Sequence, residues 1–146
     1  MSGPTLFVSR PSIAIDNIST VDKAERMAPK TPAPESLLPL TPAVFHILMA
    51  VAEDDRHGYA IIQDVAERTR GEVKLSAGTL YRSIQRMLDD DLIVETSERP
   101  APDDDDERRR YYRITPFGAA VARAETRRLA ELVRMARASG FVLRRT

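Results

Sequence analysis

Residues 76–90 constrain the fold more than any other part of the chain, because their spacing predicts a helix with two chemically different faces. Ser76 is a favourable N-cap residue for this helix. The apolar side chains repeat at helical spacing along one stripe, which holds Leu80, Ile84, Met87 and Leu88. The opposite stripe holds Thr79, Arg82, Gln85 and Arg86. One face is therefore expected to pack against a core, while the other stays exposed to solvent.

Two shorter helices are expected before this one. The first follows Thr41, a suitable N-cap, and Pro42, which fits the first helical position because its missing amide is not needed there. Its pattern stops at the acidic residues 53–55. The second begins near Gly58 and ends near Gly71, a natural left-handed C-cap. The apolar stripes of the two helices comprise Val44, Ile47, Leu48 and Val51, and Ile61, Ile62, Val65 and Ala66. Both helices are interpreted as scaffold.

A short ribbon is expected after the third helix. Residues 92–94 form a strand-like apolar run, and residues 111–115 alternate as its antiparallel partner. The intervening segment, 96–107, contains Pro100 and Pro102, which cannot donate to a ladder and belong in a loop. Three helices followed by a two-stranded ribbon form the plan of a winged helix-turn-helix. The predicted fold class is therefore mainly α with a small two-stranded β wing.

A long helix is expected towards the C-terminus. It starts with Thr115 and Pro116, which repeat the cap and proline of the first helix, and it meets no breaker before Gly140. At 1.5 Å per residue it would be about 36 Å long. It is amphipathic and no later segment covers its apolar side, so it is expected to pair with a second copy of the chain. The residues predicted to form this dimer contact are Val121, Leu129, Leu132, Val133 and Ala136.

Composition argues against several classes of function. The chain has no cysteine, which rules out disulfides and thiolate metal sites. No apolar run approaches the roughly 20 residues that would span a bilayer, so a cytoplasmic protein is expected. His46 and His57 are the two residues suited to act as bases at neutral pH, and they are interpreted as a packed core residue and a turn residue. Since the chain also lacks a glycine-rich phosphate loop, neither an enzyme nor a bound cofactor or metal is expected.

Charge is distributed unevenly along a chain whose formal net charge is zero. Residues 87–107 hold ten acidic residues and one arginine, whereas residues 108–146 hold eleven arginines and two glutamates. Local arginine clusters can neutralise phosphates within a Debye length of roughly 8 Å even when the whole chain is neutral. The sequence therefore permits a polyanionic partner, but the acidic run 103–107 would repel it, so the tip of the ribbon is expected either to be held away from it or to be a flexible, solvated loop.

Six short motifs occur in a characteristic order: Thr41-Pro42, His57-Gly58-Tyr59, Gly78-Thr79-Leu80-Tyr81, Asp91-Leu92-Ile93, Arg109-Arg110-Tyr111-Tyr112 and Thr115-Pro116-Phe117-Gly118. Over residues 40–137 the chain resembles the PadR family of bacterial transcriptional regulators, in particular its shorter branch with a single C-terminal helix. The resemblance implies a winged helix that binds DNA and a C-terminal part that forms dimers. It also implies that the third helix enters the major groove while the wing contacts the adjacent backbone.

The resemblance and the exposed face together suggest roles for individual residues. Arg82 and Arg86 are expected to donate to guanine edges or phosphates. Ser76 and Thr79 suit phosphate contacts near the helix N-terminus, where Gly78 would permit close approach. The full predicted DNA-binding set is Tyr59, Ser76, Gly78, Thr79, Tyr81, Arg82, Arg86, Arg108, Arg109 and Arg110.

Some of these assignments leave alternatives open. Tyr59 and Tyr81 either contact DNA or pack with only a polar tip outward. The arginines at 108–110 either reach phosphates from the root of the wing or form salt bridges with residues 103–107.

Residues outside the winged helix are expected to play other parts. Residues 1–38 contain five prolines and no sustained apolar period, which predicts a disordered N-terminal extension. This extension is interpreted either as a simple tail or as an arm that touches DNA or a partner. Residues 39–115 are assigned to the winged-helix domain, 116–140 to the dimerisation helix and 141–146 to a tail.

The resulting hypothesis is a homodimeric, sequence-specific DNA-binding regulator, and specifically a repressor, that binds an inverted repeat. A small-molecule effector that alters the packing of the C-terminal helices would change the spacing of the two DNA-binding winged helices, called the reading heads below. The alternative is a winged helix that binds proteins without reading DNA. Such a module would present apolar anchors on its third helix, whereas the predicted exposed face carries arginines.

Overall fold

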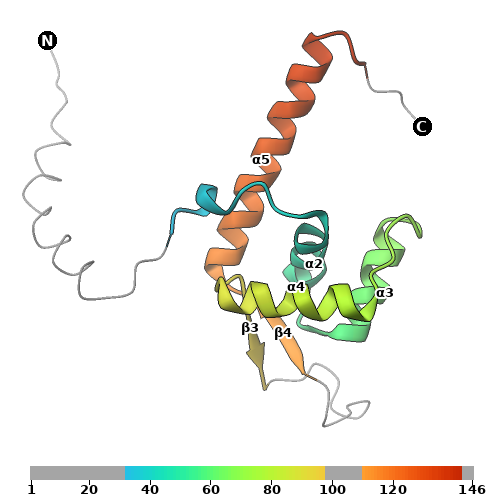
Figure 1. The fold of residues 1–146 in the computed structure, drawn as a ribbon, viewed down its shortest axis with the longest axis vertical. Helices are drawn as coiled ribbons and strands as arrows, with labels where there is room; N and C mark the ends of the chain where they lie inside the picture. Colours follow the sequence, from blue (N-terminus) through green and yellow to red (C-terminus); the bar gives the residue numbers. More distant parts are fainter. Residues whose placement is uncertain (1–31, 98–109, 143–146) are drawn as a thin grey trace, which may run out of the picture. The chain divides into compact units, whose positions relative to one another are not determined.

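Figure 1 shows the fold of the computed structural model, which describes residues 32–97 and 110–142. The elements are η1 (Pro34–Leu37), α2 (Pro42–Glu53), β2 (Arg56–His57), α3 (Gly58–Arg68), α4 (Ala77–Asp89), β3 (Ile93–Thr96), β4 (Tyr111–Ile114) and α5 (Pro116–Ala138). The described residues from Pro34 onward belong to one compact unit. The predicted class, mainly α with a small antiparallel sheet and a long C-terminal helix, is confirmed.

Side-chain caps fix where the helices begin. At α2, α4 and α5 the side-chain oxygen of Thr41, Ser76 or Thr115 accepts a hydrogen bond from the amide three residues later, at 3.2, 3.1 and 2.8 Å. These three starts are the ones that the sequence predicts. At α3 the cap is His57, whose Nδ1 accepts from the amide of Ala60 at 3.2 Å. His57 is therefore the last residue of β2 and the cap of α3, and not the turn residue that the sequence predicts.

The apolar stripes of the first three helices meet in one core. The fully buried side chains include Ile47, Leu48, Ile61, Val65, Leu80 and Met87. Each such side chain contributes roughly 1.5–3 kcal/mol by leaving water. His46, predicted to be a packed core residue, is only partly buried, and its Nδ1 has no hydrogen-bond partner among the described residues. The core leaves the outer side of α4 uncovered.

The sheet has three strands, in the order β2-β4-β3, and not the two that the sequence predicts. β3 pairs with β4 as expected, with Ile93 opposite Ile114. The additional strand, β2, pairs antiparallel with β4 and places His57 opposite Tyr111. Two residues are too few to display the period-2 alternation that identifies a strand in a sequence. β2 exists because a distant segment supplies its hydrogen-bonding partner.

The segment 34–40, called the strap below, differs from the predicted disordered extension 1–38. It contains η1, and its residues Leu37, Leu38 and Leu40 pack partly buried against the core. The amide of Leu40 also donates to Oε2 of Glu125 on α5 at 3.4 Å. The folded unit therefore begins before residue 38, because the three leucines of the strap pack against the apolar surface of the core.

Removing the strap is expected to destabilise the subunit. A chain that starts at residue 41 loses the burial of three leucines and leaves Glu125 without its amide donor, which should lower the unfolding free energy by about 2 kcal/mol. Thermal denaturation should show a decrease on the order of 10 °C. The matched control is a chain that starts at residue 32, which keeps the strap; equal melting temperatures for the two chains would contradict the packing.

Helix α5 has a buried first half and an exposed second half, which projects away from the other elements (Figure 1). Val121 has no exposed surface and belongs to the core of the subunit. Its predicted part in a dimer contact is therefore wrong, because a fully covered side chain cannot touch a second copy. The apolar spacing continues along both halves of the helix, so the sequence pattern alone does not separate them.

Candidate nucleic-acid interface

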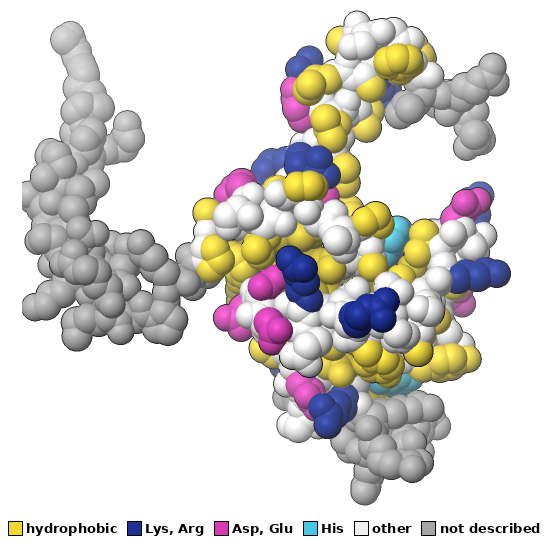
Figure 2. Space-filling model, viewed as in Figure 1, with side chains coloured by type: hydrophobic (Ala, Val, Ile, Leu, Met, Phe, Trp, Pro, Cys, Tyr) yellow, Lys and Arg dark blue, Asp and Glu magenta, His cyan; other side chains and the backbone are white. Residues whose placement is uncertain are grey.

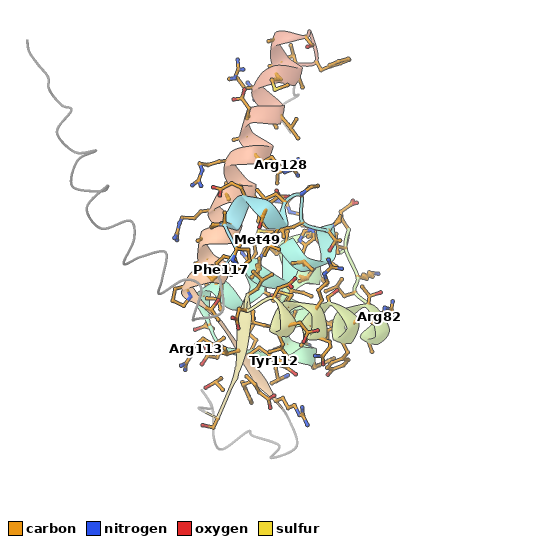
Figure 3. The ribbon with its side chains drawn as sticks, turned by 60° about the vertical axis from the view of Figure 1, so that its left-hand side comes forward. Met49, Arg82, Tyr112, Arg113, Phe117 and Arg128 are labelled. Carbon is orange, nitrogen blue, oxygen red and sulfur yellow. The ribbon has the colours of Figure 1, made fainter. Side chains whose placement is uncertain are left out.

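The outer face of α4 is the surface that the fold leaves open beside the sheet. Leu80, Ile84 and Met87 are buried beneath it, while Arg82 and Arg86 are exposed. Figure 3 shows Arg82 on the solvent side of this helix. In Figure 2 the face over α4 carries basic side chains, with acidic ones towards β3. The segregation of faces thus follows the predicted stripes.

Arg82 folds back along the helix over Gly78. A β-carbon built on Gly78 would lie 3.3 Å from Nη1 of Arg82, so the absence of a side chain at 78 leaves room for the guanidinium. Among residues 32–97 and 110–142, no carboxylate forms an ion pair with Arg82. Its donors are therefore available to an acceptor from outside the subunit.

The N-terminus of α4 is organised by two hydroxyl groups. Oγ of Ser76 accepts from the amide of Thr79 and donates to Oγ1 of Thr79, both at 3.1 Å. The amides of Ala77 and Gly78 precede the first helical hydrogen bond, as at any helix start. These amides and the positive end of the helix dipole favour an anion such as a phosphate near Arg82.

Two exposed tyrosines border this face. Tyr59 stands at the start of α3, and more than half of its side chain is exposed. Tyr81 is also about half exposed, but its ring leans on α3: a β-carbon built on Gly58 would lie 2.5 Å from the Tyr81 hydroxyl oxygen. Gly58 therefore makes room for Tyr81, and one edge of the ring packs while the rest remains accessible.

An aromatic cluster supports the root of the ribbon behind this face. The rings of His57 and Tyr111 meet edge to face, with centroids 5.3 Å apart and an interplanar angle of 87°. Tyr112 is buried, and this burial raises the pKa of its hydroxyl, which the nearby Glu95 raises further. His57 thus caps α3 and packs against β4 at the same time. Its role was missed because histidine is not among the preferred N-cap residues.

A network of charged groups holds β2 in place. Nε of Arg56 donates to the carbonyl of Ala50 at 2.6 Å, near the end of α2. Its Nη2 lies 3.4 Å from Oδ1 of Asp64 on α3. From β4, Nη2 of Arg113 donates to Oδ2 of Asp55 at 2.8 Å. The contact between Arg113 and Asp55 joins segments that are distant in sequence, so no local pattern predicts it, whereas both partners of Arg56 lie within eight residues of it.

The predicted wing arginines lie mostly outside the described residues. Arg108 and Arg109 belong to the segment 98–109, whereas Arg110 lies at the edge of the described part. Nε of Arg110 is 3.7 Å from Oε2 of Glu95, and its side chain is largely exposed. The described ion pair of Arg110 is thus with Glu95 on β3, and the predicted alternative, a salt bridge with residues 103–107, lies outside the described residues.

The second half of α5 presents an uncovered apolar surface. Leu132 and Val133 are 45% and 40% exposed, and the neighbouring Met135 is exposed as well. Leu129 and Ala136, also predicted for the dimer contact, are partly buried. We call these five residues the distal apolar face. Leaving such a group of side chains in water is unfavourable, so the face suits a protein contact.

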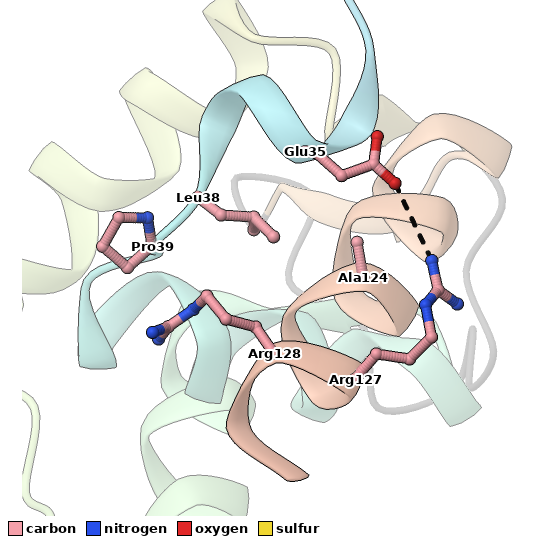
Figure 4. Close-up of a pocket in the computed structure, with 6 residues that line it drawn as sticks. All are labelled: Glu35, Leu38, Pro39, Ala124, Arg127 and Arg128. Atoms are coloured by element: carbon pink, nitrogen blue, oxygen red, sulfur yellow. Dashed lines mark ion pairs between the residues drawn. The ribbon is translucent and has the colours of Figure 1, made fainter. Parts of the chain in front are cut away.

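An open pocket of about 530 Å³ separates the strap from α5 (Figure 4). Leu38, Pro39 and Ala124 supply its apolar wall, and Arg127 and Arg128 stand at its sides. Nη2 of Arg127 lies 3.9 Å from Oε2 of Glu35 on the opposite wall. Both arginines have an acidic partner, so the pocket has little net charge.

Glu125 is the buried charge next to this pocket. Its Oε1 accepts from Nε of Arg128 at 2.6 Å and its Oε2 from Nη2 at 2.9 Å. The hydrogen bond from Arg128 lowers the pKa of the Glu125 carboxyl, with a smaller contribution from the amide of Leu40. The carboxylate therefore stays ionised and joins the strap to α5.

Two further properties concern metals and membranes. Within the described residues, no group of three or more His, Asp or Glu side chains is placed to hold a metal ion. No helix in this part of the chain combines the length and apolar character needed to cross a membrane.

A protein-family model matches the central part of the chain. The "Transcriptional regulator PadR-like family" matches residues 47–124, which is more than half of the chain. A protein from Lysinibacillus sphaericus that carries the name "Uncharacterized protein X" is 34% identical over 74 residues. These cover 51% of this chain and 65% of the relative, so the similarity spans less than two thirds of that relative's length.

Solved structures share the fold at low sequence identity. A transcriptional regulator from Clostridium thermocellum matches 68% of this chain and 90% of its own, with a TM-score of 0.56 and 24% identity. A PadR family transcription regulator from Clostridium difficile R20291 matches 66% of this chain and 96% of its own, with a TM-score of 0.56 and 23% identity. At these identities the likeness supports the arrangement of the elements and not a particular ligand.

Proposed function

Because the chain belongs to the PadR-like family of transcriptional regulators, we propose that it is a homodimeric repressor that reads DNA sequence through α4. Its family assigns it a regulatory and not an enzymatic role. The observation that carries the proposal is the pair of exposed arginines, Arg82 and Arg86, on a helix whose other side is buried in the core. A DNA regulator of this kind acts in the cytoplasm.

In the proposed complex, α4 enters the major groove. Arg82 and Arg86 donate to guanine O6 and N7 or to phosphates, and Ser76, Gly78 and Thr79 accommodate a phosphate at the helix start. Tyr59 and Tyr81 flank the groove and contact the backbone. The wing adds phosphate contacts through Arg108, Arg109 and Arg110.

The proposed dimer forms through the distal apolar face of α5. Pairing of two copies covers Leu129, Leu132, Val133 and Ala136 and leaves the winged helices free to face one duplex. Two-fold symmetry then requires an operator that is an inverted repeat, with half-sites about one helical turn apart, roughly 34–36 Å. Division of the chain into a DNA-binding part up to residue 115 and a dimerisation helix is part of this proposal.

We further propose that a small-molecule effector regulates the dimer through α5. A ligand that binds one arrangement of the C-terminal helices more tightly than another shifts the spacing of the reading heads and thereby the affinity for DNA. The pocket between the strap and α5 supports this idea, because it adjoins the buried Glu125 that links the two elements.

A second candidate is a module that binds proteins through the same face. The exposed rings of Tyr59 and Tyr81 favour it, since aromatic side chains are frequent anchors of protein interfaces. We place it second because Arg82 and Arg86 form the centre of the face, where such a module needs apolar side chains. A selection of bound duplexes from a random-sequence library separates the two candidates: recovery of no enriched sequence would favour the second.

Arginine substitutions test the outer face of α4, which we call the reading face. We expect Arg82→Ala and Arg86→Ala each to weaken binding to the selected duplex by about 1–3 kcal/mol, that is, 5- to 150-fold, because each removes a donor to a base or phosphate. Titration by fluorescence anisotropy at several salt concentrations measures the loss and separates base from phosphate contacts. Arg123→Ala, an equal charge change on the exposed side of α5, serves as control. Wild-type affinity in both α4 variants would refute the assignment.

A further inference from the structure

The residue that caps the end of α4 is an acidic partner for one of the arginines of this helix. Nε of Arg86 lies 3.7 Å from Oδ2 of Asp90, one turn further along the chain. The side chain of Arg86 is 77% exposed and that of Asp90 is 34% exposed. The guanidinium is therefore open to solvent, while the carboxylate is more covered.

Asp90 is held in position by the way α4 ends. Its amide donates to the carbonyl of Arg86 at 2.9 Å, and the next residue, Asp91, takes a left-handed conformation with φ 63° that stops the helix. The amide of Leu92 then returns to the carbonyl of Met87 at 2.9 Å. These hydrogen bonds fix the backbone on both sides of Asp90 and keep its carboxylate near Arg86.

The strap lies across a cleft from the same pair of side chains. Arg86 and Asp90 line a narrow cleft of about 70 Å³ together with Leu37, Pro39 and Leu40 of the strap. Asp90 thus has less freedom than an aspartate on an open surface. Arg82, by contrast, has no carboxylate partner among the described residues and lies over Gly78. The two arginines of the reading face differ in this respect.

We propose that Asp90 is a specificity-determining residue that positions Arg86 and opposes its contact with phosphate; this inference rests on the proposed DNA-binding function. On a random duplex Arg86 contacts mainly phosphates. It then exchanges the carboxylate of Asp90 for a phosphate, and the phosphate comes close to the negative charge of Asp90. At a specific site it finds O6 and N7 of guanine, which are uncharged acceptors that Asp90 repels much less. Asp90 therefore weakens non-specific binding more than specific binding.

Asp90→Asn, with Asp91→Asn as matched control, tests this inference. Both variants remove one negative charge at the end of α4, and asparagine tolerates the left-handed conformation at 91. The two probes are the duplex selected by the wild-type protein and a random-sequence duplex of equal length, titrated at one salt concentration. We expect Asp90→Asn to strengthen binding to the random duplex about fivefold and to the selected duplex less than about twofold. Asp91→Asn should change both affinities by the same factor.

A third variant shows whether the effect passes through Arg86. In an Arg86→Ala background, Asp90→Asn is expected to leave the ratio of specific to non-specific affinity unchanged, because no guanidinium remains to be positioned. Thermal denaturation of each variant confirms that it is folded. The inference would be overturned if Asp90→Asn left the ratio of specific to non-specific affinity unchanged, or if Asp91→Asn lowered this ratio as much as Asp90→Asn does. It would also be overturned if Asp90→Asn still lowered the ratio in the Arg86→Ala background. A wild-type protein that does not distinguish the two duplexes would instead remove the proposed function, and this inference with it.

Discussion

Gly118→Ala is expected to destabilise the subunit by about 3 kcal/mol or more, because a β-carbon at this position would overlap the backbone carbonyl of Leu92. The neighbouring backbone has no freedom to move aside. Leu92 O accepts from the amide of Thr115 at 3.0 Å, and Oγ1 of Thr115 donates to the carbonyl of Asp91 at 2.6 Å. The start of α5 and the start of β3 are thus locked together at the point where the extra atom would be placed.

Thermal or urea denaturation measures this effect, with an expected decrease in melting temperature on the order of 15 °C. Gly78→Ala is the matched control, since it is the same substitution in the first turn of another helix. There the new β-carbon meets only the flexible end of Arg82, at 3.3 Å. Replacing a helical glycine by alanine in open space stabilises by up to about 1 kcal/mol. Equal stability of the two variants would show that the contact between α5 and β3 is not as close as described.

Leu132→Glu combined with Val133→Glu is expected to convert the dimer into monomers and to weaken operator binding more than about 100-fold. The two side chains are 45% and 40% exposed in the subunit, so the substitutions should leave its fold intact. In a dimer, four added carboxylates would instead be buried close together, which is strongly unfavourable. A monomer binds one half-site at a time and loses the gain in effective concentration that linked reading heads provide.

Light scattering gives the oligomeric state, and anisotropy titration on the selected duplex gives the affinity. Ala138→Glu is the control, because it adds charge at an exposed position of the same helix, on the side opposite Leu129, Leu132, Val133 and Ala136. A double variant that remains dimeric would place the interface elsewhere. A monomeric variant with full operator affinity would show that dimerisation is not needed for binding.

Much of the fold could be predicted because its signals are local. Thr41, Ser76 and Thr115 each precede a periodic apolar segment, and each caps the helix that the sequence predicts. A cap acts on an amide three residues away, and a helical stripe repeats within one turn. Both can be recognised without knowledge of the rest of the chain. The exposure of Arg82 and Arg86 follows from the same periodicity.

The features that were missed depend on distant partners. β2 needs β4, more than fifty residues later, and the strap needs the apolar surface between α4 and α5. Val121 and Leu132 have similar spacing on α5, yet one is covered by the winged helix and the other is not. The burial of Glu125 could not be predicted, because a glutamate in an arginine-rich helix normally stays in solvent.

The sequence by itself determined where the helices start, which side of each is apolar and which side of α4 carries arginines, since short-range hydrogen bonding and side-chain periodicity set these properties. Only the tertiary structure decided how far along α5 the core extends, that Arg86 and Asp90 share a cleft with the strap, and that Gly118 leaves no space above Leu92. These depend on which surfaces meet after the chain has collapsed, and close packing fixes such contacts to within a fraction of an atomic diameter.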